Sequence, residues 1–292
     1  MTGAGEYGAI LDAVRGVRWP ARHPVPGALP GAHHSRMRGL APEFAEYRPY
    51  RQGDDPRRLD WRVLARTDRA YLRLSTDRAI LPTMLVVDAS ASMAWPPDTL
   101  AKWRCARQVA VALAAVAHEA HDPVGLVVSS AGGFRRLAPR SRRGVIGEIA
   151  RTLDATRPQG GASLVEGARG VERGRLVLVT DFLGEAQALL ALAREHLAAG
   201  GEVHAVHVVA REELEPPAQA IPATDPENDD IARTLVPETR AEYLSTFAAW
   251  RRTLAREWRV AGAGYAMVAT DEPIGRAVRR LVAPAAERAE HA

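Results

Sequence analysis

The chain has 292 residues, with 39 lysines and arginines against 35 acidic residues and a single cysteine. One cysteine excludes an intrachain disulfide and a site built from several thiolates, and a chain of this length buries a sizeable core without either. The longest apolar stretch, Val109 to Ala117, is far shorter than the roughly 20 residues that a membrane-spanning helix needs. We therefore expect a soluble, cytoplasmic protein without a membrane partner.

The positive charge is concentrated towards the N-terminus. Residues 15–78 hold 14 arginines against 7 acidic residues, whereas the rest of the chain has a slight excess of acidic groups. An acidic partner, whether a protein, a nucleic acid or an anionic lipid, would bind such a surface.

The first 78 residues predict a helix followed by a small β-rich part. Apolar residues at helical spacing from Ile10 to Val17 favour a short helix that breaks near Gly16, and prolines make residues 20–31 an irregular connector. Short β-prone pieces between turns follow, at residues 44–50, 61–65 and 70–74. We expect these pieces to form an antiparallel appendage that buries its large apolar side chains, which are Phe44, Trp61, Leu64, Leu72 and Leu74.

The remainder of the chain alternates between apolar strands and amphipathic helices. Strands are predicted at residues 84–87, 124–129, 176–179, 203–209 and 265–269, with an edge strand or hairpin partner at 134–137. Helices are predicted over 98–118, 146–153 and 185–199, after a capping box at Thr239 and Glu242, and after Pro273, with Asp98 as the cap of the first. This order predicts an α/β fold with a doubly wound, mostly parallel sheet of the Rossmann type and a small N-terminal β-rich appendage.

Polar side chains follow two of the predicted strands at the point where each strand ends. Asp88, Ser90 and Ser92 come directly after the first buried strand, and Asp181 follows the strand at 176–179. The carboxyl edge of an open α/β sheet is where ligands bind, and Mg²⁺ prefers oxygen ligands. The pattern therefore predicts a metal site, although Asp and Ser after a strand also serve as ordinary turn and helix-capping residues.

Signatures of catalysis are absent from the sequence. An aspartate-dependent phosphatase would need a carboxylate two residues after Asp88, where Ser90 stands, and neither Ser90 nor Ser163 lies in a Gly-x-Ser-x-Gly elbow. His118 and His121 are three residues apart, not the four of a zinc protease helix, and no Gly-x-x-x-x-Gly-Lys loop is present. We therefore expect a protein that is not an enzyme.

The pattern of Asp88, Ser90, Ser92 and Asp181 around a glycine turn resembles a von Willebrand factor A domain over roughly residues 79–284. The resemblance implies a metal-ion-dependent adhesion site in which these four residues hold Mg²⁺ or Mn²⁺. That family places a threonine after a Gly-Gly turn, whereas here Ala162 follows Gly160 and Gly161. Either Ser163 supplies the missing oxygen through a shifted loop, or a water does.

The stretch upstream narrows the resemblance further. The segments Arg36–Gly39, Glu43–Phe44, Tyr47–Tyr50, Gly53–Arg58 and Leu59–Trp61 closely match the signature of a bacterial family, domain of unknown function 58. Members carry a von Willebrand factor A-like domain after the signature and are commonly encoded beside a MoxR-type AAA+ ATPase. The chain would then divide into an N-terminal helix and connector (1–35), an arginine-rich β-rich signature module (36–78) and a von Willebrand factor A-like domain (79–292).

Together, these observations predict a protein-interaction adaptor. It would engage a MoxR-type ATPase or that ATPase's client through a divalent-metal adhesion site, in a chaperone-like or metal-insertion assembly. The alternative is a nucleic-acid-binding protein that uses the arginines of residues 15–78 and the aromatic residues among them. Seven acidic residues in the same stretch, and the absence of a known nucleic-acid motif, argue against that alternative.

Overall fold

The computed structural model describes residues 3–22, 33–51, 54, 59–160, 162–217, 221–225, 228–235 and 237–283. The chain divides into two compact units, one made of Met1–Trp19 with Pro82–Ala292 and the other of Pro20–Leu81. The N-terminal helix therefore belongs with the larger unit, whereas the sequence placed it in a separate segment, 1–35. The reason is burial, because Tyr7, Ile10 and Val14 are part of the larger unit's core.

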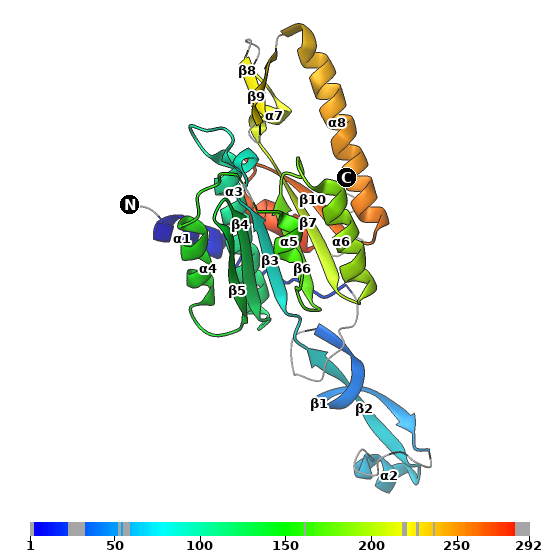
Figure 1. The fold of residues 1–292 in the computed structure, drawn as a ribbon. Coiled ribbons are helices and arrows are strands. Elements are labelled where there is room, and N and C mark those ends of the chain that lie inside the picture. The colour runs from blue at the N-terminus through cyan, green and yellow to red at the C-terminus, as the bar shows by residue number, and fades with distance from the viewer. Residues whose placement is uncertain are drawn as a thin grey trace. The chain divides into compact units, whose positions relative to one another are not determined.

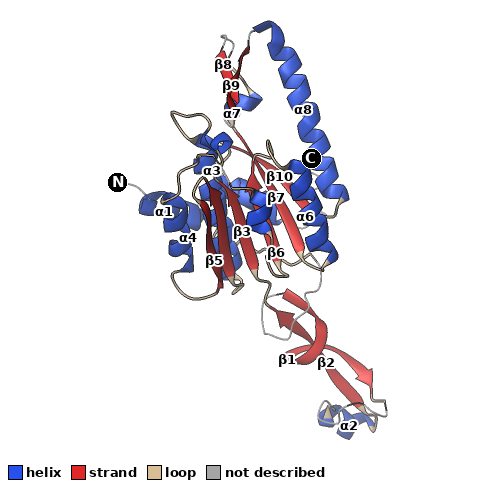
Figure 2. Ribbon diagram, viewed as in Figure 1, coloured by secondary structure: helices blue, strands red, loops and turns tan. Residues whose placement is uncertain are grey.

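A six-stranded sheet forms the centre of the larger unit, in the order β10-β7-β6-β3-β4-β5 (Figures 1 and 2). Its strands are β3 (Thr83–Asp88), β4 (Val124–Ser130), β5 (Gly133–Arg140), β6 (Arg175–Thr180), β7 (Glu202–Val209) and β10 (Gly264–Ala269). All neighbours pair in parallel except β5, which is antiparallel to β4 at one edge. The predicted α/β fold with a doubly wound, mostly parallel sheet is confirmed.

Helices cover both faces of this sheet because alternate residues of each strand point to opposite sides. Leu85 and Val87 of β3 pack in one cluster with α1 (Gly3–Ala13), α3 (Ala101–Glu119), α4 (Val145–Asp154) and α9 (Ile274–Val282). Met84 and Val86 pack in a second cluster with α5 (Leu164–Ala168), α6 (Ala186–Ala198) and α8 (Pro237–Val260). The apolar run from Met84 to Val87 thus serves two cores, as expected for a central parallel strand.

Two predicted helix starts are wrong. Leu100, with a φ of 50°, is the N-cap of α3, and no side chain caps that helix, so Asp98 is not its cap. Helix α8 begins at Pro237, which leaves Thr239 inside the first turn instead of at the cap. Proline suits a first helical position because the N–H that it lacks would have had no partner there. The segment between β7 and α8 contains α7 (Arg211–Leu214) and an antiparallel pair, β8 (Ile221–Asp225) and β9 (Asn228–Leu235).

The smaller unit pairs β1 (His33–Pro49) with β2 (Tyr71–Ala79) in antiparallel fashion. The stretch predicted as a strand at 61–65 is instead helix α2 (Trp61–Thr67), capped by Asp60, which accepts hydrogen bonds from the backbone N–H groups of Arg62 and Val63. No residue of α2 is buried, and Trp61 is 63% exposed, so the expected burial of Trp61 and Leu64 is wrong. Leu72 is buried as expected.

Several sequence predictions fall outside the described residues. These are most of the connector at 20–31, most of the turn at 53–56, Gly161, and the side chains of Phe44 and Leu74. Within the part of the chain that is described, no helix is long and apolar enough to cross a membrane.

Candidate functional site

Two carboxylates meet at the carboxyl edge of the central sheet. Asp88 is the last residue of β3, and Asp181 directly follows β6, the parallel neighbour of β3. Thr180, the last residue of β6, donates a hydrogen bond of 2.7 Å from its hydroxyl to Asp88 Oδ2 and so links the two strand ends. The structure therefore places the predicted carboxylates on adjacent strands at one edge.

The two serines lie in the loop that follows Asp88. The Ser90 N–H donates to Asp88 Oδ1 at 2.9 Å, and Ser92 lies in a short 3₁₀ helix, Ala91–Ala94. The two serine Oγ atoms are 3.1 Å apart. Adjacent ligands of an octahedral Mg²⁺ at about 2.1 Å would be about 3 Å apart, so this spacing suits one edge of such an octahedron. Asp88, Ser90 and Ser92 therefore fit a hard divalent cation.

Asp181 is held in a tight turn at the start of the β6–α6 loop. Its Oδ1 accepts a hydrogen bond from the Leu183 N–H at 3.1 Å, and Phe182 between them is buried with a φ of 59°. A bulky residue in this left-handed conformation stores strain, of a kind that clusters at functional sites. The turn leaves the side chain of Leu183, two residues after Asp181, 52% exposed.

A buried lysine occupies the other oxygen of Asp181. Lys102, in the first turn of α3, places its Nζ 2.9 Å from Asp181 Oδ2 and 2.7 Å from Glu213 Oε1, and its side chain is 1% exposed. Glu213 lies on α7 and also accepts a hydrogen bond from the Ala210 N–H through Oε2. Asp181, which the resemblance implies is a metal ligand, is thus engaged in an ion pair with Lys102.

The electrostatics of the site follow from burial and from this lysine. Burial raises the pKa of Asp88, and the nearby charge of Asp181 raises it further, while the Thr180 hydroxyl opposes the shift. Burial also raises the pKa of Glu213, against the attraction of Lys102. For Lys102, burial alone would lower the pKa, but the charges of Asp181 and Glu213 outweigh it and hold the pKa above its usual value.

The Ser163 hydroxyl makes hydrogen bonds at the start of α5. Its hydroxyl donates to Glu185 and accepts from the Glu166 N–H, so Ser163 is the N-cap of α5. Ala162, which precedes it, has no side-chain oxygen. The role of Ser163 as a metal ligand stays a prediction.

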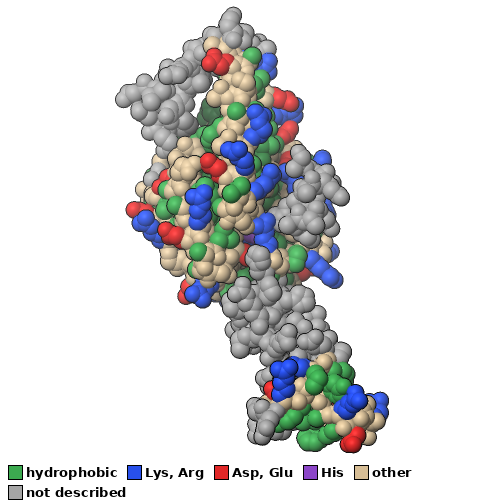
Figure 3. Space-filling view, turned by 90° about the vertical axis from the view of Figure 1, so that its right-hand side faces the viewer, with side chains coloured by type: hydrophobic (Ala, Val, Ile, Leu, Met, Phe, Trp, Pro, Cys, Tyr) green, Lys and Arg blue, Asp and Glu red, His purple; other side chains and the backbone are tan. Residues whose placement is uncertain are grey.

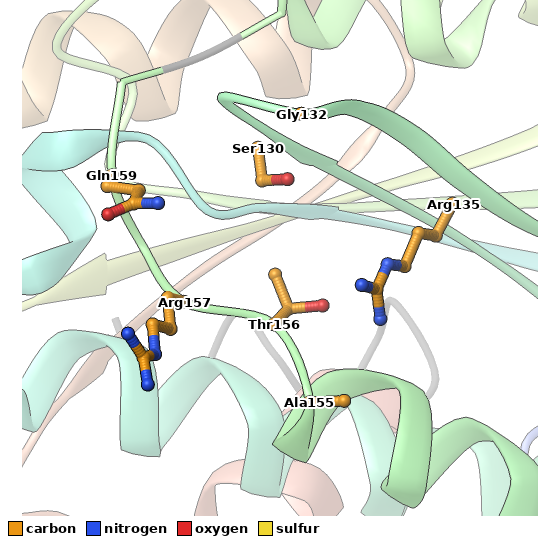
Figure 4. Close-up of a pocket in the computed structure, with 7 residues that line it drawn as sticks. All are labelled: Ser130, Gly132, Arg135, Ala155, Thr156, Arg157 and Gln159. Atoms are coloured by element: carbon orange, nitrogen blue, oxygen red, sulfur yellow. The ribbon is translucent and has the colours of Figure 1, made fainter.

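A polar pocket lies beside the serine loop (Figure 4). It has a volume of about 250 Å³, and its lining includes Ser130, Arg135, Thr156, Arg157 and Gln159. Gln159 joins the pocket to the site because its N–H donates to the carbonyl of Ala89, the residue after Asp88. The guanidinium of Arg135 extends towards Thr156 (Figure 4), which makes this side of the pocket suited to an anion such as a carboxylate.

Among the described residues, the histidines are not part of a metal-binding cluster. His121, with a φ of 63°, lies beyond the end of α3, and no group of three or more His, Cys, Asp or Glu side chains there could hold a metal ion. On the face shown in Figure 3, basic side chains are spread among acidic and apolar ones.

Three residues of this site were missed by the sequence analysis. Thr180 adjoins a predicted carboxylate, and Lys102 is the only lysine of the chain, so each had a signal in the sequence. Glu213 had none, because it lies in a polar stretch with several other acidic residues.

Comparison with known proteins gives relatives and a family. The chain is 29% identical over 285 residues to the uncharacterized protein Rv1480 of Mycobacterium tuberculosis, covering 94% of this chain and 89% of that protein. Solved structures with a related fold include an aerotolerance-related membrane protein from Bacteroides fragilis (16% identity, 69% of this chain and 98% of that chain, TM-score 0.42). Another is the SpRpn10 VWA domain (10% identity, 68% of this chain and 92% of that chain, TM-score 0.39). Residues 46–253 match the family described as protein of unknown function DUF58, and the chain belongs to that family.

Proposed function

We propose that this protein is a non-enzymatic interaction adaptor that engages a MoxR-type AAA+ ATPase, or a client of that ATPase, in a chaperone-like or metal-insertion assembly. The contact is made through the carboxyl edge of the central sheet. The partner class comes from the resemblance to domain of unknown function 58 described above. One observation carries the proposal: two carboxylates and two serine hydroxyls from adjacent strand ends are gathered at that edge.

The chemistry of this edge suits binding better than catalysis. Asp88, Ser90, Ser92 and Asp181 are the residues that would hold Mg²⁺ or Mn²⁺. When bound, such an ion offers an open coordination position that a carboxylate from another protein can fill. Asp88 itself is held by the Ser90 N–H and the Thr180 hydroxyl, which fix its position without activating it as a nucleophile.

Features next to the carboxylates support recognition of an acidic partner. Arg135 and Arg157 border the pocket beside the serine loop, and the exposed Leu183 offers an apolar contact next to Asp181. An acidic segment with an apolar residue would satisfy both. Charge steering of such a partner weakens as salt screens it.

Co-purification with the MoxR-type ATPase tests the proposal. The protein is tagged and its association with the ATPase is measured in Mg²⁺ and in EDTA, for wild type, Asp88→Ala and Asp181→Ala. We expect both substitutions and chelation to reduce association strongly. Glu195→Ala is the matched control, because Glu195 is an exposed carboxylate on α6 and should leave association unchanged.

Two results would contradict the proposal in different ways. Association that survives chelation and both substitutions would rule out a contact through the metal site. Turnover of a phosphate ester or peptide that Asp88→Ala abolishes would show that the protein is an enzyme.

A further inference from the structure

Lys102 is singular in both sequence and structure. It is the only lysine of the chain, and all other strongly basic side chains are arginines. It is also buried, with its ammonium between the carboxylates of Asp181 and Glu213. An ammonium is a compact point charge on a flexible stem, whereas a guanidinium is a broad planar group, so the two residues are not interchangeable in a confined space.

The charge balance around Lys102 explains what the ammonium does there. Asp88 and Asp181 are buried carboxylates and Glu213 is a partly buried one, and Lys102 is the cation that pairs with Asp181 and Glu213. Buried carboxylates need a nearby positive charge, which a protein supplies either as a bound metal ion or as a basic side chain. In this site the basic side chain lies on Asp181, which a metal ion at Asp88, Ser90 and Ser92 would also use.

We propose that Lys102 is a built-in competitor of the divalent cation: its ammonium, held in place by Glu213, occupies Asp181 and keeps the cation affinity of the site low. The proposal rests on the proposed function only in taking Asp88, Ser90, Ser92 and Asp181 as the residues that hold the cation. It adds that the cation occupancy of the site is controlled by an ion pair within the chain. A metal ion and Lys102 would therefore exclude one another at Asp181.

The position of Glu213 gives this competition a means of control. Glu213 belongs to α7, a four-residue helix outside the sheet, and its Oε2 is fixed by the Ala210 N–H. The backbone carbonyl of Glu213 accepts a hydrogen bond of 3.2 Å from the Tyr243 hydroxyl of α8. Movement of α7 away from α3 would take one carboxylate from Lys102 and weaken its hold on the site.

Removal of the ammonium tests the proposal directly. Binding of Mn²⁺ alone is measured by titration calorimetry on the full chain, for wild type and Lys102→Met. We expect Lys102→Met to bind Mn²⁺ about tenfold or more tightly than wild type, because the positive charge that pairs with the Asp181 carboxylate is removed. The thermal midpoint of Lys102→Met should also rise with added Mn²⁺ more than that of wild type, since a ligand stabilises the state that binds it.

Three further variants make the result specific. Arg104→Met removes an exposed positive charge from the same turn of α3 and should leave Mn²⁺ affinity at the wild-type level. Lys102→Met with Asp181→Asn should lose the gain, because the freed carboxylate is gone. Lys102→Met with Glu213→Met replaces the pair by apolar groups, as buried ion pairs often tolerate, and should still bind Mn²⁺ more tightly than wild type.

If Lys102→Met alone does not fold, the variant with both Lys102→Met and Glu213→Met tests whether removal of the ammonium tightens Mn²⁺ binding. Equal Mn²⁺ affinity in wild type and in a folded variant without Lys102 would overturn the proposal, as would a gain that survives Asp181→Asn. Failure here is separate from failure of the proposed function, because no partner takes part in the measurement. Conversely, Mn²⁺ affinity could rise in Lys102→Met while association with the ATPase is unchanged by Asp88→Ala. That combination would support the competition by Lys102 and would contradict the proposed contact through the metal site.

Discussion

At the scale of single residues, Ala162 differs from the metal ligand that the resemblance implies, and one substitution can restore that ligand. The resemblance expects a threonine at this position, and the methyl of alanine offers no oxygen to a cation. We expect Ala162→Thr to tighten Mn²⁺ binding about tenfold or more, because even a residue that only supports a metal ligand changes metal affinity by about that factor. Ala162→Val is the control, because valine has the shape of threonine without its hydroxyl. Equal calorimetric titrations for the two variants would show that position 162 does not contribute a ligand.

The stability of the larger unit should depend on pH because of His207, a buried histidine on β7. It is buried, hydrogen-bonded to the Tyr265 hydroxyl at 2.6 Å, and in ring contact with Phe182 and Trp250. Burial lowers its pKa to about 3; Lys102 and Arg251 act in the same direction, and Asp181 opposes them. Between pH 3 and 6.5 the unfolded chain therefore binds a proton that the folded chain does not, so stability falls as pH drops through this window and is unaffected above it.

Denaturation at two pH values measures this effect. From pH 6.5 to 5 the protonation of His207 in the unfolded state should cost about 2 kcal/mol of unfolding free energy, since each pH unit is worth about 1.4 kcal/mol. Urea denaturation of wild type and His207→Gln is compared at pH 7.5 and at pH 5. The variant starts less stable but should lose less stability on acidification. The same loss in both proteins would mean that His207 is not the group responsible.

At the scale of elements, the sheet was predictable because its strands are apolar runs buried on both faces. Met84 to Val87 reads directly as a central strand, and β6 and β7 read in the same way. Errors arose at helix starts and in the small unit, where local chemistry decides the outcome. Trp61 and Val63 have high β-propensity, yet the Asp60 carboxylate caps two backbone N–H groups and fixes a helix. The same holds for the candidate site. Asp88 and Asp181 could be predicted because they follow apolar strands, whereas the pairing of Lys102 with Glu213 could not, because it depends on long-range packing.

The cap of α2 gives a prediction for this element. Asp60 Oδ1 accepts hydrogen bonds from the N–H groups of Arg62 and Val63, and Oδ2 accepts one from the Tyr47 hydroxyl. Asp60→Ala should destabilise α2 by about 1 kcal/mol, while Asp60→Asn, which keeps a capping oxygen, should cost less. Hydrogen exchange of the amides of residues 64–67 checks this, with about fivefold faster exchange expected in the alanine variant. Exchange in the alanine variant that is as slow as in wild type would show that the cap does not hold the helix.

At the scale of the whole molecule, the first 19 residues and the last described helix complete one core, although a separate unit is inserted between them in sequence. Arg279 of α9 donates a hydrogen bond of 2.7 Å to the carbonyl of Ala13. Further along, Arg175 at the start of β6 is fully buried, donates to the carbonyl of Trp19 at 3.1 Å, and lies 4.0 Å from the centre of its ring. The N-terminal segment thus covers a buried guanidinium that has Glu202 and Asp122 as its acidic partners.

Removing the ring of Trp19 should therefore destabilise the larger unit as a whole. Trp19 is 3% exposed and lies over Arg175 and beside His204, so its loss leaves a cavity and removes a cation–π contact from a buried charge. We expect Trp19→Ala to lower the free energy of unfolding by about 3–5 kcal/mol. Trp61→Ala is the matched control, because the ring of Trp61 is largely exposed and its loss should change stability by less than about 0.5 kcal/mol. Urea denaturation followed by circular dichroism compares the two. Equal midpoints would show that the N-terminal segment only lies against the core and contributes nothing to its stability.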